Sequence, residues 1–561
     1  MRNTRNTRNT QDRDDGIMRL DFSDEFLLDS AEKRYESGDF MGALTMLNKR
    51  AGMYRPSADA SALYADIYEA LSLWIPCADA WFRFLDTCNE ADFGEGYEGL
   101  SVAFANMGDG LRAELYYRRS FEASGETPPL PEYDEEERAP EHHPQLRLVH
   151  SDDGTVTDPE LLHRGVMFVK TGELDKAREV LSEIGPESKD FPSACGLIAM
   201  CKLLAGDTAG AAEECERMLE YHPDNIHALT TYCAVLGAQE RKEEAKAVAK
   251  KLAAIDSDSM EDLYRIATAL CETGLDEEAF EKLTKLKDLQ PYDDDILWFH
   301  AVAAFRSGRK EEAISSLETL TTVYPRKVIA KLYLEHLRGD KETSLSYFYR
   351  LEDDAYKELS SLLLMADGLT PEMAERLGES NDMANFIRLA FDQLQGNDQK
   401  LIQLAGKIAV KCRCDDVVRE LLLDFEGNEF VKLSMMKDLV ERNEDNSFGV
   451  VICNFYREFY THKMEFDGRR PDQFMKAFAE VYSRYSITAD DNERKLLYAA
   501  EDVNYTLVDA DADDLFAEKE ALAAVIYREA RLADGEHGIE TIAGLFNANV
   551  HTVKEILNFL I

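Results

Sequence analysis

The sequence contains no uninterrupted apolar run near the length of about 20 residues that a membrane-spanning helix requires. We therefore expect no transmembrane helix. The N-terminal stretch MRNTRNTRNTQDRDDG has no apolar segment after its arginines, which is not the pattern of a secretory signal peptide. This polar, repetitive stretch predicts a disordered leader over residues 1–20, and Met18 is an alternative start just before the first apolar pattern.

Basic residues are also scarce. The chain has 64 Lys and Arg against 109 Asp and Glu, a formal net charge of −45. A field of this sign repels phosphate, so binding to nucleic acid or to an anionic membrane surface is not expected. The charge favours basic partners only mildly, because an acidic excess is also typical of solvated helix faces.

Motifs for catalysis and cofactor binding are missing. There is no glycine-rich phosphate loop, no nucleophile elbow and no metal-binding HExxH helix, and Cys412 and Cys414 lack a second pair at zinc spacing. We therefore predict a protein that is not an enzyme and has no cofactor or metal. Several cysteines fall on expected core faces, as small buried residues do in a reducing compartment, and this predicts a cytoplasmic protein: Cys195, Cys201, Cys215, Cys233 and Cys271.

What the chain does have is a repeat of 34 residues. Alanine recurs at this spacing at Ala177, Ala211, Ala245, Ala279 and Ala313. Five residues before each alanine, in order, stand Gly172, Gly206, Glu240, Gly274 and Gly308. Each unit is long enough for two short helices, with small residues at their crossing and glycine at the turn between them. Neither helix can bury its apolar face alone, so neighbouring units must stack.

This pattern resembles the tetratricopeptide repeat (TPR) family, because repeat length, small-residue phase and turn residues agree over five consecutive units. One unit departs, with Glu240 in place of the turn glycine and Ser257 in place of a closing proline. A weaker block precedes it, with Ala43, Ala78 and Ala113 spaced by 35 residues. The resemblance implies an all-α fold, a TPR-type α-solenoid of two blocks followed by a C-terminal all-helical domain.

The expected domain order follows from these patterns. It is a leader (1–20), an N-terminal TPR-like block of about three units (21–125), an acidic and proline-rich linker (126–157), the main array of five units plus a cap (158–340), a helical domain (341–530) and a helix-turn-helix-like hairpin (531–561).

In the TPR family, ligands lie in the concave groove lined by the first helix of each unit. The resemblance places a mostly apolar set of residues there: Leu162, Val166, Met200, Leu203, Thr230, Tyr264, Thr268, Trp298, Val302 and Phe305. The subgroup that grips C-terminal carboxylates uses Lys and Asn at such positions, so this ligand class is excluded. An apolar groove predicts a protein or peptide ligand, for example an amphipathic helix. The alternative is that the protein's own C-terminal domain covers these residues.

The last residues, GIETIAGLFNANVHTVKEILNFLI, resemble a helix-turn-helix. Its second helix offers His551, Thr552, Lys554 and Asn558 as polar contacts to DNA. A groove-reading helix normally carries more Arg or Lys, so a hairpin that caps the domain or joins an interface is the competing interpretation.

A second acidic pattern has the spacing of a calcium loop: Asp509, Asp511, Asp513 and Glu520. Asp514, however, stands where the sharp turn requires glycine. The competing interpretation is an acidic helix N-terminus stabilised by the helix dipole.

The sequence therefore predicts a non-enzymatic scaffold that binds a peptide or helical segment in the concave groove. The alternative is a TPR-containing transcriptional regulator whose C-terminal hairpin contacts DNA. Neither the partner nor the oligomeric state follows from the sequence.

Overall fold

A computed structural model of the chain describes residues 22–125, 157–339, 341–394, 398–462, 466, 472–488, 491–532 and 538–560. The expected leader and nearly all of the expected linker lie outside these residues. Within them the chain is built almost wholly of α-helices stacked as hairpins, which confirms the predicted all-α solenoid class. None of the described helices is both long enough and apolar enough to cross a membrane.

The N-terminal block is three helical hairpins. It consists of α1 (Asp24–Glu36), α2 (Phe40–Ala51), α3 (Ala58–Ala70), α4 (Trp74–Thr87), the 3-10 helix η1 (Glu90–Asp92), α5 (Phe93–Asn106) and α6 (Gly110–Ala123). Gly38 and Gly108 turn the chain with φ of +79° and +80°. The next residue in both turns, Asp39 or Asp109, caps the second helix by accepting a hydrogen bond from a backbone N–H.

The main array is five further hairpins. It consists of α7 (Asp158–Lys170), α8 (Leu174–Leu181), α9 (Phe191–Leu204), α10 (Thr208–Tyr221), α11 (Ile226–Ala238), α12 (Lys242–Ala253), α13 (Met260–Thr273), α14 (Asp276–Leu289), α15 (Asp294–Arg306) and α16 (Lys310–Val323). The five repeat alanines are all buried where the two helices of a unit cross. The four turn glycines have φ between +71° and +80°, and Glu240 adopts the same left-handed conformation at +58°.

Residues 328–461 form what we call the body. It consists of α17 (Val328–Arg338), α18 (Asp353–Asp367), α19 (Pro371–Gly378), α20 (Asn381–Leu394), α21 (Gln399–Lys411), α22 (Asp415–Leu423), α23 (Glu429–Arg442), β1 (Asn446–Ile452) and β2 (Phe455–Thr461).

The antiparallel hairpin β1–β2 is a departure from the expectation that residues 341–530 are wholly helical. Cys453 and Asn454 both have positive φ, +52° and +63°, as a two-residue hairpin turn requires. The run Val450-Val451-Ile452 is β-branched throughout, and such residues pack better on a pleated sheet than in a helix. A second departure is residues 341–352, which contain neither helix nor strand.

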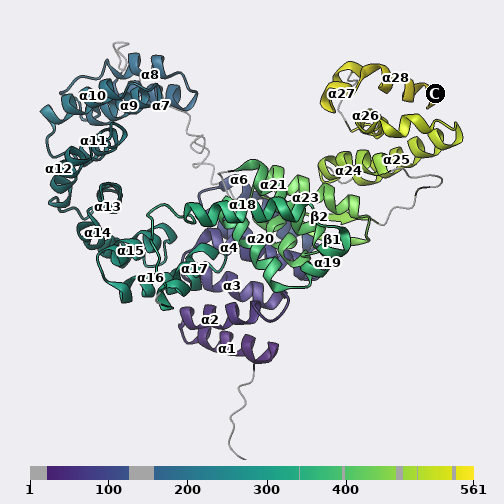
Figure 1. Ribbon diagram of the computed structural model, residues 1–561, viewed down its shortest axis with the longest axis horizontal. Coiled ribbons are helices and arrows are strands. Elements are labelled where there is room, and N and C mark those ends of the chain that lie inside the picture. The colour runs from purple at the N-terminus through teal and green to yellow at the C-terminus, as the bar shows by residue number, and fades with distance from the viewer. Residues whose placement is uncertain are drawn as a thin grey trace, which may run out of the picture.

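The C-terminal helices project from the body (Figure 1). They are α24 (Asp472–Tyr485), α25 (Asn492–Asp509), the 3-10 helix η2 (Asp513–Ala517), α26 (Lys519–Glu529), α27 (Ile539–Leu545) and α28 (Val550–Phe559). Helices α27 and α28 are joined through Asn547, whose φ is +53°, and Ile542, Val553 and Ile556 are buried between them and α26.

The N-terminal block does not stack on the start of the main array. It packs on the end of that array, where α2 contacts α16, and on the body, where α4 contacts α22 and β1 (Figure 1). Asn48 and Tyr68 donate hydrogen bonds to the carbonyls of Thr322 and Val323, both at 2.8 Å. Tyr116 donates to the carbonyl of Asn454 in the β-hairpin turn at 2.6 Å. The main array therefore forms a curved arc that extends away from the region where its last hairpin, the N-terminal block and the body meet (Figure 1).

Candidate functional site

The first helices of the repeat units, α11, α13 and α15 among them, lie on the inner side of the arc (Figure 1). Of the residues expected to line this side, one group is accessible to solvent at least in part. We call this group the open part of the groove: Leu162, Val166, Met200, Leu203, Thr230, Tyr264 and Thr268. Phe305 is half-buried, while Trp298 and Val302 are buried, with Trp298 only 3% exposed.

Trp298 is covered by residues 341–352, which we call the strap. The strap contains no helix or strand and bends at residues 347–350, and the burial of its side chains alternates from residue 347 to 352. Leu345 and Leu351 are buried, Tyr347 and Tyr349 are half-buried, and the intervening Phe348 is 71% exposed. Trp298 packs against the ring of Tyr349 edge to face, with the ring centroids 4.8 Å apart.

Side chains of the array and the body bind the backbone of the strap. The indole N–H of Trp298 donates to the carbonyl of Tyr347 at 3.1 Å, and the guanidinium of Arg306 donates to the carbonyl of Leu345 at 3.0 Å. On the body side, the amide oxygen of Gln393 accepts from the N–H of Leu351 at 2.7 Å. The strap is thus bound as a non-helical segment, through its backbone and its buried or half-buried side chains.

Each of the two strap tyrosines donates a hydrogen bond to a carboxylate. The hydroxyl of Tyr347 donates to Asp276 at 2.7 Å, and that of Tyr349 donates to Asp392 at 2.9 Å. Burial raises the pKa of both tyrosines far above the usual value, so both remain neutral donors. The guanidinium of Arg306 also stacks over the ring of Tyr347, 4.8 Å from its centroid.

This arrangement corrects the predicted groove at one end. Trp298 is covered by the chain itself, because the strap supplies the apolar partners that an outside ligand was expected to supply, and Val302 is buried in the same hydrophobic cluster. The alternative that the C-terminal part of the protein covers these residues therefore applies to this end alone. A signal was present in the sequence: Leu345, Tyr347, Tyr349 and Leu351 alternate with period two inside an otherwise helical pattern.

The open part of the groove has an aromatic side chain beside negative charge. Tyr264 is 36% exposed and lies near three consecutive aspartates, Asp293 to Asp295, whose charges act on it. Asp294 pairs with Lys327 at 2.7 Å. Burial, followed by the neighbouring carboxylates, raises the pKa of Asp295. An exposed ring beside acidic groups is a favourable place for a cationic group of a ligand.

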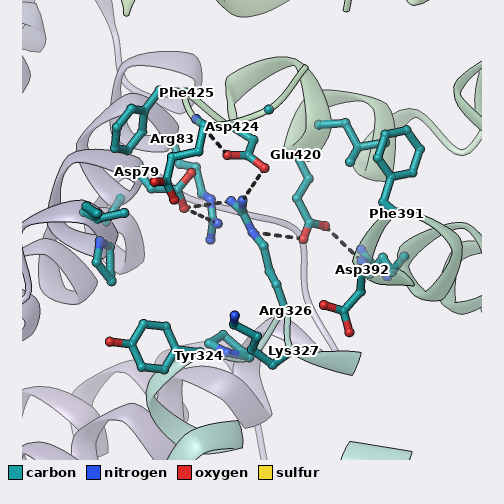
Figure 2. A pocket seen from close by; sticks show the side chains of 18 of the residues that line it. Asp79, Arg83, Tyr324, Arg326, Lys327, Phe391, Asp392, Glu420, Asp424 and Phe425 are labelled. Atoms are coloured by element: carbon teal, nitrogen blue, oxygen red, sulfur yellow. Dashed lines mark hydrogen bonds and ion pairs between the residues drawn. The ribbon is translucent and has the colours of Figure 1, made fainter. Parts of the chain in front are cut away.

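A second feature is a cavity of about 400 Å³ where the N-terminal block, the end of the main array and the body meet. Arg326 lies at its centre, with its guanidinium 2.7 Å from Asp79, 3.2 Å from Glu420 and 3.8 Å from Asp424 (Figure 2). Burial raises the pKa of Asp79 to about 6, against the opposing effect of Arg326.

The charges of this cluster come from three parts of the chain: Asp79 is in α4, Arg326 follows α16, and Glu420 and Asp424 lie at the end of α22. Tyr324, Phe391 and Phe425 line the cavity around them (Figure 2). These residues were not predicted from the sequence, because a charged residue carries no sign of a partner that lies far away in the chain. The cluster joins three parts of the molecule electrostatically.

The C-terminal hairpin exposes His551, Lys554 and Asn558, and Thr552 is half-buried. Lys554 pairs with Glu540 of α27 at 3.0 Å, so its charge is partly neutralised. DNA binding by this hairpin stays a prediction.

The four carboxylates with calcium-loop spacing lie on different elements. Asp509 ends α25, Asp513 begins η2, and Glu520 is in the first turn of α26. In the part of the chain that the structure describes, no group of three or more His, Cys, Asp or Glu side chains is arranged to hold a metal ion. The calcium alternative is therefore not supported by the geometry.

Comparison with known proteins identifies the repeats. Residues 202–270, which run from the end of α9 to α13, match the family model described as tetratricopeptide repeat. No curated protein matches the chain.

Among solved structures, the chain is similar to MamA from AMB-1 (20% identity, 29% of this chain and 96% of that one, TM-score 0.24). It is also similar to a tetratricopeptide repeat protein from Parabacteroides merdae (18% identity, 50% and 97%, TM-score 0.27). A third similar structure is yeast Tom70 (10% identity, 96% and 94%, TM-score 0.24). Scores of this size do not define a shared overall arrangement.

Proposed function

We propose that this chain, whose main array consists of tetratricopeptide repeats, is a non-enzymatic scaffold that binds a segment of a partner protein in the open part of its groove. The observation that carries the proposal is the strap. The end of the main array already binds a non-helical segment of polypeptide, through donors to its backbone and apolar contacts to its side chains. The open part continues from this end along α13, α11, α9 and α7.

The side chains of the open part indicate the chemistry of the partner segment. Met200 and Leu203 are accessible apolar residues, and Met is well suited to surfaces that adapt to a ligand. Tyr264 and the adjacent aspartates favour a Lys or Arg in the same segment. The net charge of −45 speeds the approach of a basic partner. We therefore expect a segment with aliphatic or aromatic residues and at least one cation.

Photo-crosslinking in cells tests this proposal. A photoreactive amino acid at position 264 or 200 should form a discrete adduct with the same partner. At Lys250, an exposed residue of the second helix of its unit, the same substitution should not. Equal adducts at all three positions would mean that the groove has no special role.

Binding of the partner so identified is then measured with purified proteins. Tyr264→Ala should weaken it about tenfold, since aromatic residues at interface centres contribute roughly 1–2 kcal/mol or more. Lys250→Ala is the matched control and should leave the dissociation constant unchanged. An unchanged constant for Tyr264→Ala would overturn the assignment of the groove.

A further inference from the structure

The strap is held differently from the elements around it. Among the described residues, the backbone of 342–351 makes no hydrogen bond to another backbone group. Its contacts are to side chains, among them Trp298, Arg306 and Gln393. The strap can therefore leave without breaking a backbone hydrogen bond of a helix or a sheet.

Release of the strap would expose buried side chains of the last two repeats of the main array. Cys271 and Trp298 are buried and both contact the strap, Cys271 through Tyr347 and Trp298 through Tyr347 and Tyr349. Tyr347 lies against Cys271 and Phe299. This surface adjoins the open part of the groove on helix α13. Thr268 lies about one turn before Cys271 on this helix, and Tyr264 lies about one turn before Thr268.

We propose that the surface under the strap is a second peptide-binding site, which takes a non-helical segment with two tyrosines separated by one residue and is occupied in cis by residues 341–352. The proposal goes beyond the open part of the groove, and rests on the proposed function only in that both sites share the concave face.

The preference for tyrosine over phenylalanine follows from the two carboxylates. Asp276 and Asp392 each accept a hydrogen bond from a strap hydroxyl. A phenylalanine at either position would leave a carboxylate with one donor fewer in a partly buried place, and such losses are costly. The outward residue between the tyrosines, Phe348, is exposed and is not read by the site.

The covalent connection of the strap to the chain determines which segment occupies the second site. A segment joined to its own site by a short linker acts at an effective concentration of about 1 mM or more. A partner segment present at micromolar concentration therefore cannot displace an intact strap by itself. It binds when the strap has been weakened, so the strap regulates access to this end of the groove.

Thiol labelling of the intact protein tests whether the strap opens as a unit. Burial raises the pKa of Cys271 to about 12, so its thiol is unreactive while it is covered. The double variant Tyr347→Ser, Tyr349→Ser removes two rings and three hydrogen bonds: those donated to Asp276 and Asp392, and the one that the Tyr349 hydroxyl accepts from the N–H of Ala330. The labelling rate of Cys271, followed by peptide mass mapping, should rise about tenfold or more, since each lost hydrogen bond contributes roughly a factor of five.

Two controls belong to this measurement. Phe348→Ser makes the same kind of change on the outward face and should leave the rate unchanged. Cys233, buried in α11 away from the strap, should stay unlabelled in every variant. If Cys233 also reacts, the double variant has unfolded the array, and Tyr347→Phe, which removes one hydroxyl, replaces it. No rise at Cys271 with either variant would overturn the proposal.

A peptide with the sequence of residues 341–352, labelled with fluorescein, then tests binding in trans. It should bind the double variant, and bind the wild-type chain at least tenfold more weakly. Trp298→Ala in the double variant should weaken binding about tenfold, and so should phenylalanine at both tyrosine positions of the peptide. A chain with Cys271 uncovered that does not bind the peptide would show that the strap is only a cover.

These results are independent of the open part of the groove. The adduct formed at position 264 does not require the strap surface, so loss of that adduct with normal peptide binding contradicts only the proposed function. Normal adducts without peptide binding contradict only the second site.

Discussion

At the scale of single residues, Glu240 has a backbone conformation that is unfavourable for its residue type. It adopts φ of +58° at a turn where the other four units of the main array have glycine. A left-handed conformation costs an ordinary residue about 1 kcal/mol. The turn keeps its shape because the helices on either side pack through Leu236 and Ala245.

We predict that Glu240→Gly stabilises the chain. The expected gain in the free energy of unfolding is about 0.5–1 kcal/mol, because glycine relieves the left-handed strain but loses more entropy on folding. Chemical denaturation followed by circular dichroism measures it. Gly206→Ala, the reverse change at the equivalent turn of the preceding unit, should destabilise the chain, and a loss of stability in Glu240→Gly would contradict this account.

His300 is a buried titratable residue that makes the stability of the folded chain depend on pH. It is 1% exposed, and its ring nitrogens lie 2.9 Å from the hydroxyl of Ser316 and 3.3 Å from that of Thr284. Burial, and then the charge of Lys287, lower its pKa to about 3. Between pH 6.5 and 3 the unfolded chain binds a proton that the folded chain does not, so stability falls as the pH is lowered.

The expected loss from His300 is about 3 kcal/mol at pH 4 relative to neutral pH. Urea denaturation at pH 7 and pH 4 measures it, with His300→Gln as the comparison. The variant should have a lower free energy of unfolding than the wild-type chain at pH 7. Its free energy of unfolding should fall less than that of the wild-type chain between pH 7 and pH 4. An identical pH dependence in both proteins would show that His300 is protonated in the folded state.

At the scale of elements, the β-hairpin and the strap are the two segments that depart from the helical pattern, and both make contacts far along the chain. The turn of β1–β2 is bound by α6: the hydroxyl of Tyr116 donates to the carbonyl of Asn454 at 2.6 Å and accepts from the N–H of Tyr456 at 3.1 Å. The hairpin thus joins the N-terminal block to the body.

Tyr116→Phe should loosen this joint. The change removes one hydroxyl that makes two buried hydrogen bonds, which predicts a loss of about 1–3 kcal/mol in the free energy of unfolding. Hydrogen exchange should show faster exchange in β1 and β2 than in the wild-type chain. Tyr117→Phe is the matched control, since Tyr117 is 41% exposed on the same helix. Unchanged exchange in the hairpin would contradict the proposed joint.

The sequence predicted the hairpins of the main array well, because their pattern is local and repeated. Alanine at the helix crossing and glycine at the turn act within one unit of 34 residues. The strap and the β-hairpin were missed because each is short and has its partners far away in the chain. Tyr347, for example, contacts Asp276, Trp298 and Phe299, residues that lie 48 to 71 positions earlier.

At the scale of the whole molecule, the cluster around Arg326 joins three parts of the chain. Its carboxylate partners come from α4, α22 and the segment after α22. Removal of one partner from such a cluster leaves the opposite charges without compensation, which is more costly than the loss of an exposed ion pair.

Arg326→Met should therefore destabilise the contact between the N-terminal block and the body by about 3 kcal/mol. Small-angle scattering should show a larger radius of gyration if the block detaches, and the midpoint of denaturation should fall. Arg338→Met is the control, because Arg338 forms an exposed ion pair with Glu318 on the surface and such pairs contribute roughly 0–1 kcal/mol. Equal effects of the two substitutions would show that the cluster does not join the parts.

The sequence by itself determined the solenoid: the spacing of small residues and turn glycines requires paired helices that can bury their apolar faces only by stacking. The family resemblance also predicted which face of the main array would line a groove. Only the tertiary structure decided that the N-terminal block packs on the body, and that the strap fills one end of the groove. These contacts join residues up to several hundred positions apart, such as Asp79 and Arg326. Periodicity records the neighbours of a residue within its own element, and it carries no record of partners brought together by the path of the whole chain.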